Sequence, residues 1–594
     1  MSKQPETLED REDLGLVVQD IAETSRRLLE DFTARKLQNG VPSSPDPLNL
    51  SHAIFDLTTR MISQPAALMQ ANLALWQEHL GLMQTTARRM IGGGERYIEP
   101  AKDDRRFRDP AWEESIVFDF VKQSYLLTSR WLLNMINEFD GFDPKTHQKL
   151  DFYTRQFIDA MSPTNFVATN PEVLRLTLES NGENLIRGFR NLLQDLERGK
   201  GKLQIRMTDL EAFELGRNVA LTPGKVVYRN DLMELLQYTP STKQVYRRPL
   251  LIVPPWINKF YILDLQPKNS FIKYAVDQGY TVFVISWVNP DETYAQKSFE
   301  DYMQAGPLAA LDAVEQATGE REVTSIGYCL GGTLLASTIA YLKAHRRDPV
   351  KAATFFTTMT DFSNAGELGV FIEKEQLDTM EAIMAERGYL DGSEMATTFS
   401  FLRANDLVWS FVINNYLLGK DPFPFDLLYW NSDSTRMPYS MHSYYLREFY
   451  LNNKLVKPGE VQLCGTGIDL GQVDVPTYLL STREDHIAPW ISTYAATQLY
   501  KGDITFVLAG SGHIAGVINP PTSNKYGYWT NDALPAEPEV WLEAAEHNPG
   551  SWWPHWSAWN GEKSGDMVPA RQPGDGKLEV LEDAPGSYVK MRAA

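Results

Sequence analysis

The sequence predicts an α/β fold in which a mostly parallel β-sheet follows an all-helical N-terminal region. Residues 51–220 carry apolar residues at helical spacing, short apolar runs follow from residue 249 onwards, and helical segments separate those runs. Strands that are apolar throughout and alternate with helices are typical of a parallel sheet covered on both faces. We therefore expect a variable leader over 1–50, a helical domain over 51–220 and an α/β domain over 221–594.

The N-terminal half begins with a segment of linker composition. Residues 1–50 are charged at first and end in the Pro- and Ser-rich stretch NGVPSSPDP, so we expect disorder there. Residues 66–91 then form the clearest amphipathic helix. Its apolar stripe, at heptad spacing, consists of Met69, Leu73, Trp76, Leu80, Met83, Ala87 and Met90. Two interpretations remain open: the stripe packs on its own domain, or it docks a partner helix or an apolar surface.

The second half contains the predicted sheet. KVVYRNDLMELLQY alternates and turns at Arg-Asn-Asp, which predicts an antiparallel hairpin. The parallel strands are expected at Pro249–Val253, Thr281–Trp287, Val323–Gly327, Ala352–Thr358, Thr477–Ser481 and Ile504–Ala509, with helices over 297–317 and 331–346 among them. The long aromatic-rich interval 359–476 lies between the fourth and fifth strands, where a cap over the site is expected.

Composition excludes several classes of function. The formal net charge of −20 disfavours general nucleic-acid binding, because an acidic surface repels phosphates. The two cysteines, Cys329 and Cys464, provide neither a disulfide framework nor a zinc site. We expect no metal and no cofactor. We also expect no membrane-spanning segment, since the apolar runs are only as long as a strand. Cys464 has no adjacent helix start and is interpreted as inert packing.

Cys329 lies in the central motif, VTSIGYCLGG at 323–332. Gly-x-Cys-x-Gly between a strand and a helix is the nucleophile-elbow pattern of the α/β-hydrolase fold, with Cys in place of Ser. Glycines two positions before and after the nucleophile remove Cβ atoms that would clash in this strained turn. The thiol then lies at a helix N-terminus, which favours thiolate. The amide of Leu330 is expected to face the developing oxyanion.

The acid and the base of a triad are expected after later strands, in the order nucleophile, acid, base. Asp485 directly follows the strand at 477–482, and His513 follows the strand at 504–510 in a loop of small residues. Glu484 is a rival acid. His486, the neighbour of Asp485, is a candidate either to support the triad or to contact the substrate.

A second oxyanion donor is expected in LLIVPPWINKFYILDL at 250–265. Pro254 and Pro255 have no N–H, so the donor amide is expected at Trp256 or Ile257. Asp264 in this segment and Asn289 in SWVNPD are candidate substrate contacts, and Arg483 is a candidate cation for an anionic substrate.

These motifs together resemble the polyhydroxyalkanoate synthases. The resemblance covers residues 95–560 and rests on six motifs: GYCLGG, PPWINKFYILDLQP, SWVNPD, STREDHIAPW, GSGHIAGVINPP and GSWWPHWSAW. The length and the ending APGSYVK resemble class I. The family's catalytic residues fall on Cys329, Asp485 and His513. Many relatives carry Cys where Trp256 stands, which argues against an essential thiol at that position.

The resemblance implies an acyltransferase that polymerises (R)-3-hydroxyacyl-CoA, chiefly 3-hydroxybutyryl-CoA, through an acyl-cysteine and releases CoA. It also implies a homodimer in the cytoplasm, on the surface of polyester granules and with granule-associated proteins as partners. Two alternatives stay open from the residues. The same triad serves a thioesterase or an intracellular polyester depolymerase, and the apolar stripe with the tryptophan-rich end also suits an inactive granule scaffold.

Overall fold

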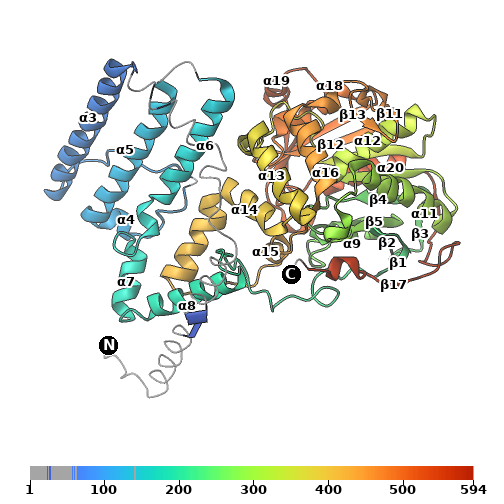
Figure 1. Ribbon diagram of the computed structural model, residues 1–594, viewed down its shortest axis with the longest axis horizontal. Coiled ribbons are helices and arrows are strands. Elements are labelled where there is room, and N and C mark those ends of the chain that lie inside the picture. The colour runs from blue at the N-terminus through green and yellow to red at the C-terminus, as the bar shows by residue number, and fades with distance from the viewer. Residues whose placement is uncertain are drawn as a thin grey trace. The chain divides into compact units, whose positions relative to one another are not determined.

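The computed structural model describes residues 63–592 except 103 and 139–141, together with 23–24, 26–27, 57 and 59 (Figure 1). The expected disordered leader therefore lies outside the described residues, apart from four positions. The chain divides into two compact units. The first comprises Met1–Asp209 with Phe399–Phe423, and the second comprises Leu210–Thr398 with Pro424–Ala594.

The first unit is helical. Its main helices are α3 (Pro65–Met90), α4 (Ala111–Glu114), α5 (Ile116–Glu138), α6 (Pro144–Ala160), α7 (Pro171–Glu179) and α8 (Glu183–Arg198). Local sequence sets their starts: Asp143 caps α6 by accepting from the amides of Lys145 and Thr146, with proline in the first turn. Helix α3 packs on α5, and α5 packs on α6.

The segment Phe399–Phe423 joins this helical unit although it lies within the interval expected to form the cap. It contains two π-helical segments, η6 (Asn405–Trp409) and η7 (Val412–Leu417). Asn184 on α8 donates to the carbonyl oxygen of Leu417 at 2.8 Å, and Asn191 donates to that of Asn415 at 3.1 Å. The domain and cap boundaries given above stay predictions.

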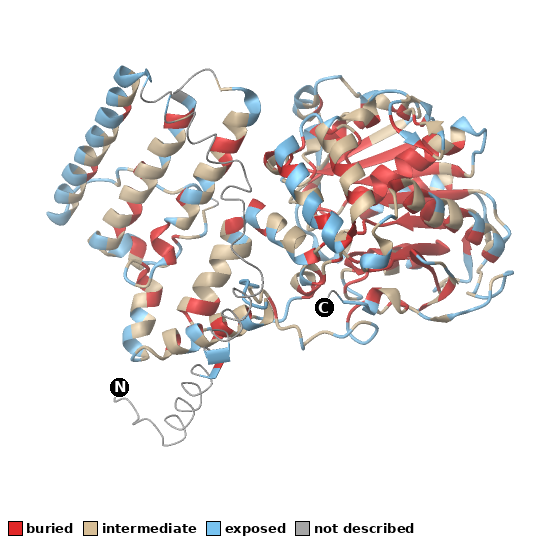
Figure 2. Cartoon of the chain, viewed as in Figure 1, coloured by how far each residue is buried: buried red, intermediate tan, exposed pale blue. Residues whose placement is uncertain are grey.

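The heptad stripe of α3 is exposed in the part of the chain that the structure describes (Figure 2). Met69 is 72% exposed and Trp76 is 68% exposed, whereas the buried residues of this helix, Ala71 and Leu82, lie on another face. The helix packs on α5 through that face. The interpretation of the stripe as core packing is therefore wrong, because heptad spacing reports only that one face is apolar and not what covers it.

The second unit contains the sheet. The strands of the large sheet are β1 (Gly224–Arg229), β2 (Met233–Tyr238), β4 (Leu250–Val253), β5 (Val282–Trp287), β6 (Val323–Tyr328), β7 (Val350–Phe356), β12 (Thr477–Thr482), β13 (Ile504–Ala509), β14 (Gly527–Thr530), β15 (Glu546–Pro549) and β17 (Glu582–Asp583). All six expected parallel strands are confirmed, and β1 and β2 form the expected antiparallel hairpin.

The strand order is β15-β14-β13-β12-β7-β6-β4-β5-β2-β1-β17. The six central strands, from β13 to β5, run parallel, and antiparallel strands flank them on both sides. This is the α/β-hydrolase architecture, as expected. The carboxyl ends of β6, β12 and β13 meet at one edge, so the loops after these strands converge there.

Alternate residues of each central strand face opposite sides of the sheet. Leu251 and Val253 of β4 pack in the cluster that contains α12 (Leu330–Ala344) and α11 (Ala309–Thr318). Leu250 and Ile252 pack in the other cluster, with α9 (Phe271–Asp277) and α20 (Trp553–Lys563). All four are fully buried, and each such side chain contributes about 1.5–3 kcal/mol to folding.

The expected helix over 297–317 is interrupted. Helices α10 (Phe299–Met303) and α11 are joined by the π-helical segment η4 (Gln304–Leu308), in which Gly306 has non-helical φ and ψ and Pro307 follows. A Cβ on Gly306 would lie 2.3 Å from the ring of Trp287. The kink therefore lets an indole of β5 approach the helix backbone.

The remaining helices of the second unit include α13 (Lys374–Arg387), α15 (Asp426–Ser432), α16 (Tyr439–Tyr444), α17 (Trp490–Tyr494), α18 (Ala496–Leu499) and α19 (Pro538–Glu543), while α14 (Gly392–Leu402) runs across the boundary of the units. Short strand pairs are β3 (Gln244–Tyr246) with β16 (Met567–Pro569), β8 (Tyr389–Leu390) with β9 (Met437–Pro438), and β10 (Gln462–Leu463) with β11 (Thr466–Gly467). Every helix of the described residues is too short or too polar to span a bilayer.

Candidate active site

Cys329 occupies a strained turn between β6 and α12. Its φ is 51° and its ψ is −124°, a conformation that L-residues rarely adopt. A Cβ on Gly327 would lie 2.4 Å from the Cα of Gly332, and one on Gly331 would lie 2.2 Å from the carbonyl oxygen of Val253. The glycines of the motif are thus required by close backbone approach, and the turn leaves the thiol half-buried.

Asp485 and His513 meet at the carboxyl edge of the sheet, where their loops converge. The Nδ1 atom of His513 lies 2.7 Å from Oδ2 of Asp485, and both side chains are buried. Thr482 donates to the same carboxylate oxygen at 3.1 Å. The other oxygen accepts from the amides of Ile487 at 2.9 Å and Ala488 at 2.8 Å. Four donors therefore hold the carboxylate, and it orients the imidazole.

The surroundings of His513 favour the protonated form of its imidazole. Burial alone would lower its pKa, but the carboxylate of Asp485 and the thiol of Cys329 outweigh burial and raise the pKa above its ordinary value. The thiol of Cys329 therefore lies within electrostatic reach of the imidazole. A thiol facing an imidazole that retains a proton is the arrangement that activates cysteine nucleophiles.

The loop of His513 is braced by residues that sequence reasoning did not assign to the site. The phenol of Tyr328 donates to the carbonyl oxygen of His513 at 3.2 Å, and the two rings stack. Trp552 and Trp553 donate from their indoles to the carbonyl oxygens of Gly516 and Val517, each at 2.9 Å. The unusual density of tryptophans near residue 550 was the only signal in the sequence for this brace.

Two further phenols that the sequence did not single out lie close to the nucleophile. Tyr445 and Tyr450 belong to the π-helical segment η8 (Tyr445–Leu451), and their ring centroids are 5.3 Å apart. Burial and, further, the charge of Cys329 raise the pKa of both phenols. Both therefore stay neutral and can donate hydrogen bonds. The aromatic run YYLREFYL carried no signal for these positions individually.

The proposed oxyanion donors lie on two converging elements. Leu330 is the first residue of α12, so its amide has no acceptor within the helix. Val253 and Pro254, at the end of β4, approach Gly331 closely. The side chain of Trp256 is buried and packs on Trp287. The donor roles of Leu330, Trp256 and Ile257 stay predictions.

The side chains of Asp264 and Asn289, two predicted substrate contacts, form hydrogen bonds with other groups of the protein. Asp264 is buried and accepts at 2.6 Å from each of the hydroxyls of Thr222 and Ser270. Asn289 accepts from the amide of Arg436 and donates to the carbonyl oxygen of Met591. These bonds give both side chains a structural role, and substrate contacts by them stay predictions.

Three other residues named in the sequence analysis, His486, Arg483 and Cys464, lie in different surroundings. His486 is half-buried beside Asp485. Arg483 is exposed, and its guanidinium stacks 5.1 Å from the ring centroid of Trp529. Gln304 donates to the Sγ atom of Cys464 at 2.6 Å, and burial raises the pKa of that thiol. The environment of Cys464 thus disfavours a nucleophile.

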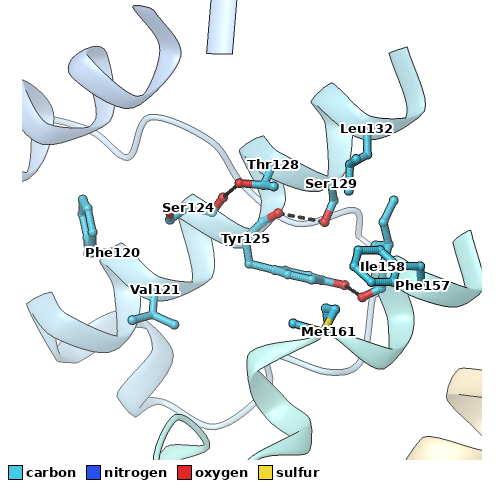
Figure 3. A pocket seen from close by; sticks show the side chains of 10 residues that line it. All are labelled: Phe120, Val121, Ser124, Tyr125, Thr128, Ser129, Leu132, Phe157, Ile158 and Met161. Carbon is cyan, nitrogen blue, oxygen red and sulfur yellow. Dashed lines mark hydrogen bonds between the residues drawn. The ribbon is translucent and has the colours of Figure 1, made fainter. Parts of the chain in front are cut away.

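The helical unit contains a hollow of about 360 Å³ (Figure 3). It is formed by α5 and by residues at the end of α6, and its walls are mainly apolar. Tyr125 reaches across it and donates to the carbonyl oxygen of Ile158 at 3.0 Å. Within the described part of the chain, no group of three His, Cys, Asp or Glu side chains is arranged to hold a metal ion.

Comparison with known families gives two matches. Residues 103–275 match the model described as the N-terminus of poly-beta-hydroxybutyrate polymerase (PhaC), and residues 248–520 match the alpha/beta hydrolase fold. A monoacylglycerol lipase structure from Paleococcus ferrophilus is 13% identical with a TM-score of 0.30, and the match covers 47% of this chain and 90% of the lipase.

Three curated relatives are similar over most of their length. The poly(3-hydroxyalkanoate) polymerase subunit PhaC of Rhizobium meliloti is 47% identical over 100% of this chain and 97% of its own. The poly(3-hydroxyalkanoate) polymerase of Methylorubrum extorquens is 52% identical, covering 90% and 88%. The corresponding subunit of Cupriavidus necator is 46% identical, covering 82% and 83%.

Proposed function

Because the chain belongs to the class I polyhydroxyalkanoate synthase family, whose members are enzymes, we propose that it polymerises (R)-3-hydroxyacyl-CoA, chiefly 3-hydroxybutyryl-CoA, and releases CoA. One observation carries the proposal. A cysteine on a strained strand–helix elbow lies close enough to a buried histidine to raise the pKa of its imidazole, and Nδ1 of that histidine is hydrogen-bonded to a buried aspartate.

Loading begins with the thiol. The Sγ atom of Cys329 attacks the thioester carbonyl carbon while His513 holds the thiol proton. The amide of Leu330 and that of Trp256 or Ile257 donate to the oxyanion. The intermediate collapses, the bond to CoA breaks, and the proton on His513 passes to the departing CoA sulfur. The products are CoA and an acyl group on Cys329.

Chain extension uses the same base. The 3-hydroxyl of one acyl unit attacks the carbonyl carbon of an acyl thioester, and neutral His513 removes the hydroxyl proton. The carbon–sulfur bond breaks, and the proton on His513 passes to the departing sulfur. Cysteine suits these two reactions because loading exchanges one thioester for another, so the free energy of loading is close to zero. The acyl group therefore keeps its activation for the downhill step to an oxoester.

Analysis of the products tests this proposal. Purified protein supplied with 3-hydroxybutyryl-CoA is expected to release CoA and form insoluble polyester. CoA release with free 3-hydroxybutyrate as the sole product would refute it in favour of the thioesterase or depolymerase alternative. Cys329→Ser and Cys329→Ala should each abolish polymerisation while circular dichroism shows an intact fold. Polymer from Cys329→Ala would instead refute the acyl-cysteine route.

We also propose that the enzyme works at the surface of polyester granules in the cytoplasm, as a homodimer and beside granule-associated proteins. The exposed stripe of α3 supports a granule contact, since its large apolar side chains extend over about 30 Å from Met69 to Met90. The homodimer rests on the family resemblance. Sedimentation at several protein concentrations, with and without a substrate analogue, tests it.

A further inference from the structure

The C-terminal segment of the chain is bound tightly across the α/β unit. Strand β17 pairs with β1, with Asp583 opposite Lys225. The amides of Ser587 and Tyr588 then each donate at 3.1 Å to the carboxylate of Glu234, a fully buried residue of β2. Residues 582–588 are therefore part of the folded unit.

Beyond this point the segment reaches a buried ion pair. The ammonium of Lys259 lies 2.8 Å from the carboxylate of Asp433, and each side chain is only 3% exposed. Lys259 also donates to the carbonyl oxygen of Val589 at 2.6 Å. The phenol of Tyr261 donates to the other oxygen of Asp433 at 3.0 Å. One ammonium thus joins three segments that are far apart in sequence.

Lys259 also lies directly after the loop that contains the proposed oxyanion donor. The indole of Trp430 donates to the carbonyl oxygen of Lys259 at 2.7 Å. The hydroxyl of Thr435 donates to the carbonyl oxygens of Trp256 and Ile257. In a trans peptide, the C=O of one residue and the N–H of the next point in opposite directions. Fixing the Trp256 carbonyl therefore fixes the direction of the Ile257 amide.

We propose that Lys259 is a positioning residue for the oxyanion loop at 256–258, and that the segment Val589–Arg592 completes the active-site scaffold by binding it. The proposal rests on the oxyanion role given to this loop under the proposed function. Two other contacts hold the same segment on the α/β unit: Asn289 donates to the Met591 carbonyl oxygen at 3.2 Å, and Arg592 lies over the ring of Tyr429.

A buried ion pair adds little net stability compared with a well-packed apolar pair, because desolvation offsets the attraction between the charges. Its bonds do, however, fix directions. Lys259 connects the loop, through Asp433, to the segment that contains Trp430 and Thr435, and it connects the same loop to the C-terminus. Loss of these bonds is expected to misplace the donor amide, and a shift of about 1 Å costs up to about a hundredfold in rate.

Two variants test the proposal. Lys259→Met with Asp433→Asn removes both charges together and leaves an acceptor for Tyr261, so no unpaired charge is buried. A chain ending at Tyr588 removes the Val589 carbonyl and retains the amides that bind Glu234. Lys273→Met is the control, since Lys273 forms an exposed ion pair with Asp277 on α9.

Two rates are compared for each variant. The first is kcat for CoA release from 3-hydroxybutyryl-CoA, which passes through an oxyanion. The second is alkylation of Cys329 by iodoacetamide, which forms none. We expect each variant to lower kcat by about ten- to a hundredfold, with KM and the alkylation rate within about twofold. We expect the two losses combined not to multiply, because both act through Lys259.

Unchanged kcat in either folded variant, an equal fall in alkylation, or losses that multiply would overturn the proposal. If the paired substitution does not fold, the truncated chain decides alone by the same two rates. Failure of the proposed function has a different signature. Wild-type protein would then give free acid in place of polyester, whereas the kcat effects would persist because hydrolysis also passes through the oxyanion.

Discussion

Asp485→Asn is expected to reverse the hydrogen-bonding pattern of His513, the proposed base. In the structure, Oδ1 of Asp485 accepts from the amides of Ile487 and Ala488, and Oδ2 accepts from Nδ1 of His513. The oxygen of an asparagine must remain on the side of the two amides, so its NH₂ group faces His513. The Nδ1 atom must then accept, and the ring proton moves to Nε2, the nitrogen that is needed as a base towards Cys329.

The opposite orientation of the asparagine is too costly to rescue the enzyme. It would place the NH₂ group against two amide donors in a buried site, and each lost bond costs about 1–3 kcal/mol. The wrong tautomer is therefore expected to persist. Loss of the base in this way typically lowers kcat by about 10³–10⁴-fold, or about 4–5.5 kcal/mol in the barrier.

The assay is steady-state CoA release from 3-hydroxybutyryl-CoA, with circular dichroism as a check on folding. Glu484→Gln is the matched control, because Glu484 is the exposed neighbouring carboxylate and the rival acid of the sequence analysis. It should change kcat by less than about twofold, the range expected for an exposed side chain away from the chemistry. A loss below about tenfold in folded Asp485→Asn would refute the tautomer argument.

Three further predictions follow from the same contacts. Asp485 and Cys329 raise the pKa of His513 to about 10, so the imidazole is protonated at pH 7. Asp485→Asn removes the attraction of the carboxylate and should lower that pKa, and an unmoved titration of His513 followed by NMR would contradict this. Trp552→Phe leaves the Gly516 carbonyl oxygen without its indole donor and should lower the free energy of unfolding in urea by about 1–3 kcal/mol. Trp529→Phe, the control, should change that free energy by less than about 0.5 kcal/mol. Equal effects of the two substitutions would argue that the indole of Trp552 does not hold the loop of His513. Leu73→Glu with Leu80→Glu should weaken binding to isolated polyester granules without changing the free energy of unfolding. Gln70→Glu with Gln77→Glu adds the same charge beside the stripe and should leave granule binding unchanged. Equal binding by both double variants would exclude the stripe as the contact.

The sequence predicted the central sheet and the strand–helix elbow well because both depend on local patterns. Continuous apolar runs define buried parallel strands, and Gly-x-Cys-x-Gly between a strand and a helix defines the elbow at Cys329. Chain order then located Asp485 and His513, since the fold places its acid and base after particular strands. The structure brings both side chains together, as the order of strands requires.

The stripe of α3 shows what a local pattern cannot report. Its spacing predicted the helix correctly, but the same spacing suits a core helix and an unpartnered one, and only the packing of α5 on the other face distinguished them. The segment Phe399–Phe423 is similar: its aromatic composition gave no sign that Asn184 and Asn191 of α8 would bind it.

What the sequence by itself determined is the fold, the family that the chain resembles and the elbow that presents Cys329, the proposed nucleophile. What only the tertiary structure decided is how the proposed site is held in place. The indoles of Trp552 and Trp553 bind the loop after His513, and Lys259 joins the oxyanion loop to Asp433 and to Val589. These partners lie tens to hundreds of residues apart in the chain. No local pattern reports their distances, because folding alone brings them within reach of a hydrogen bond.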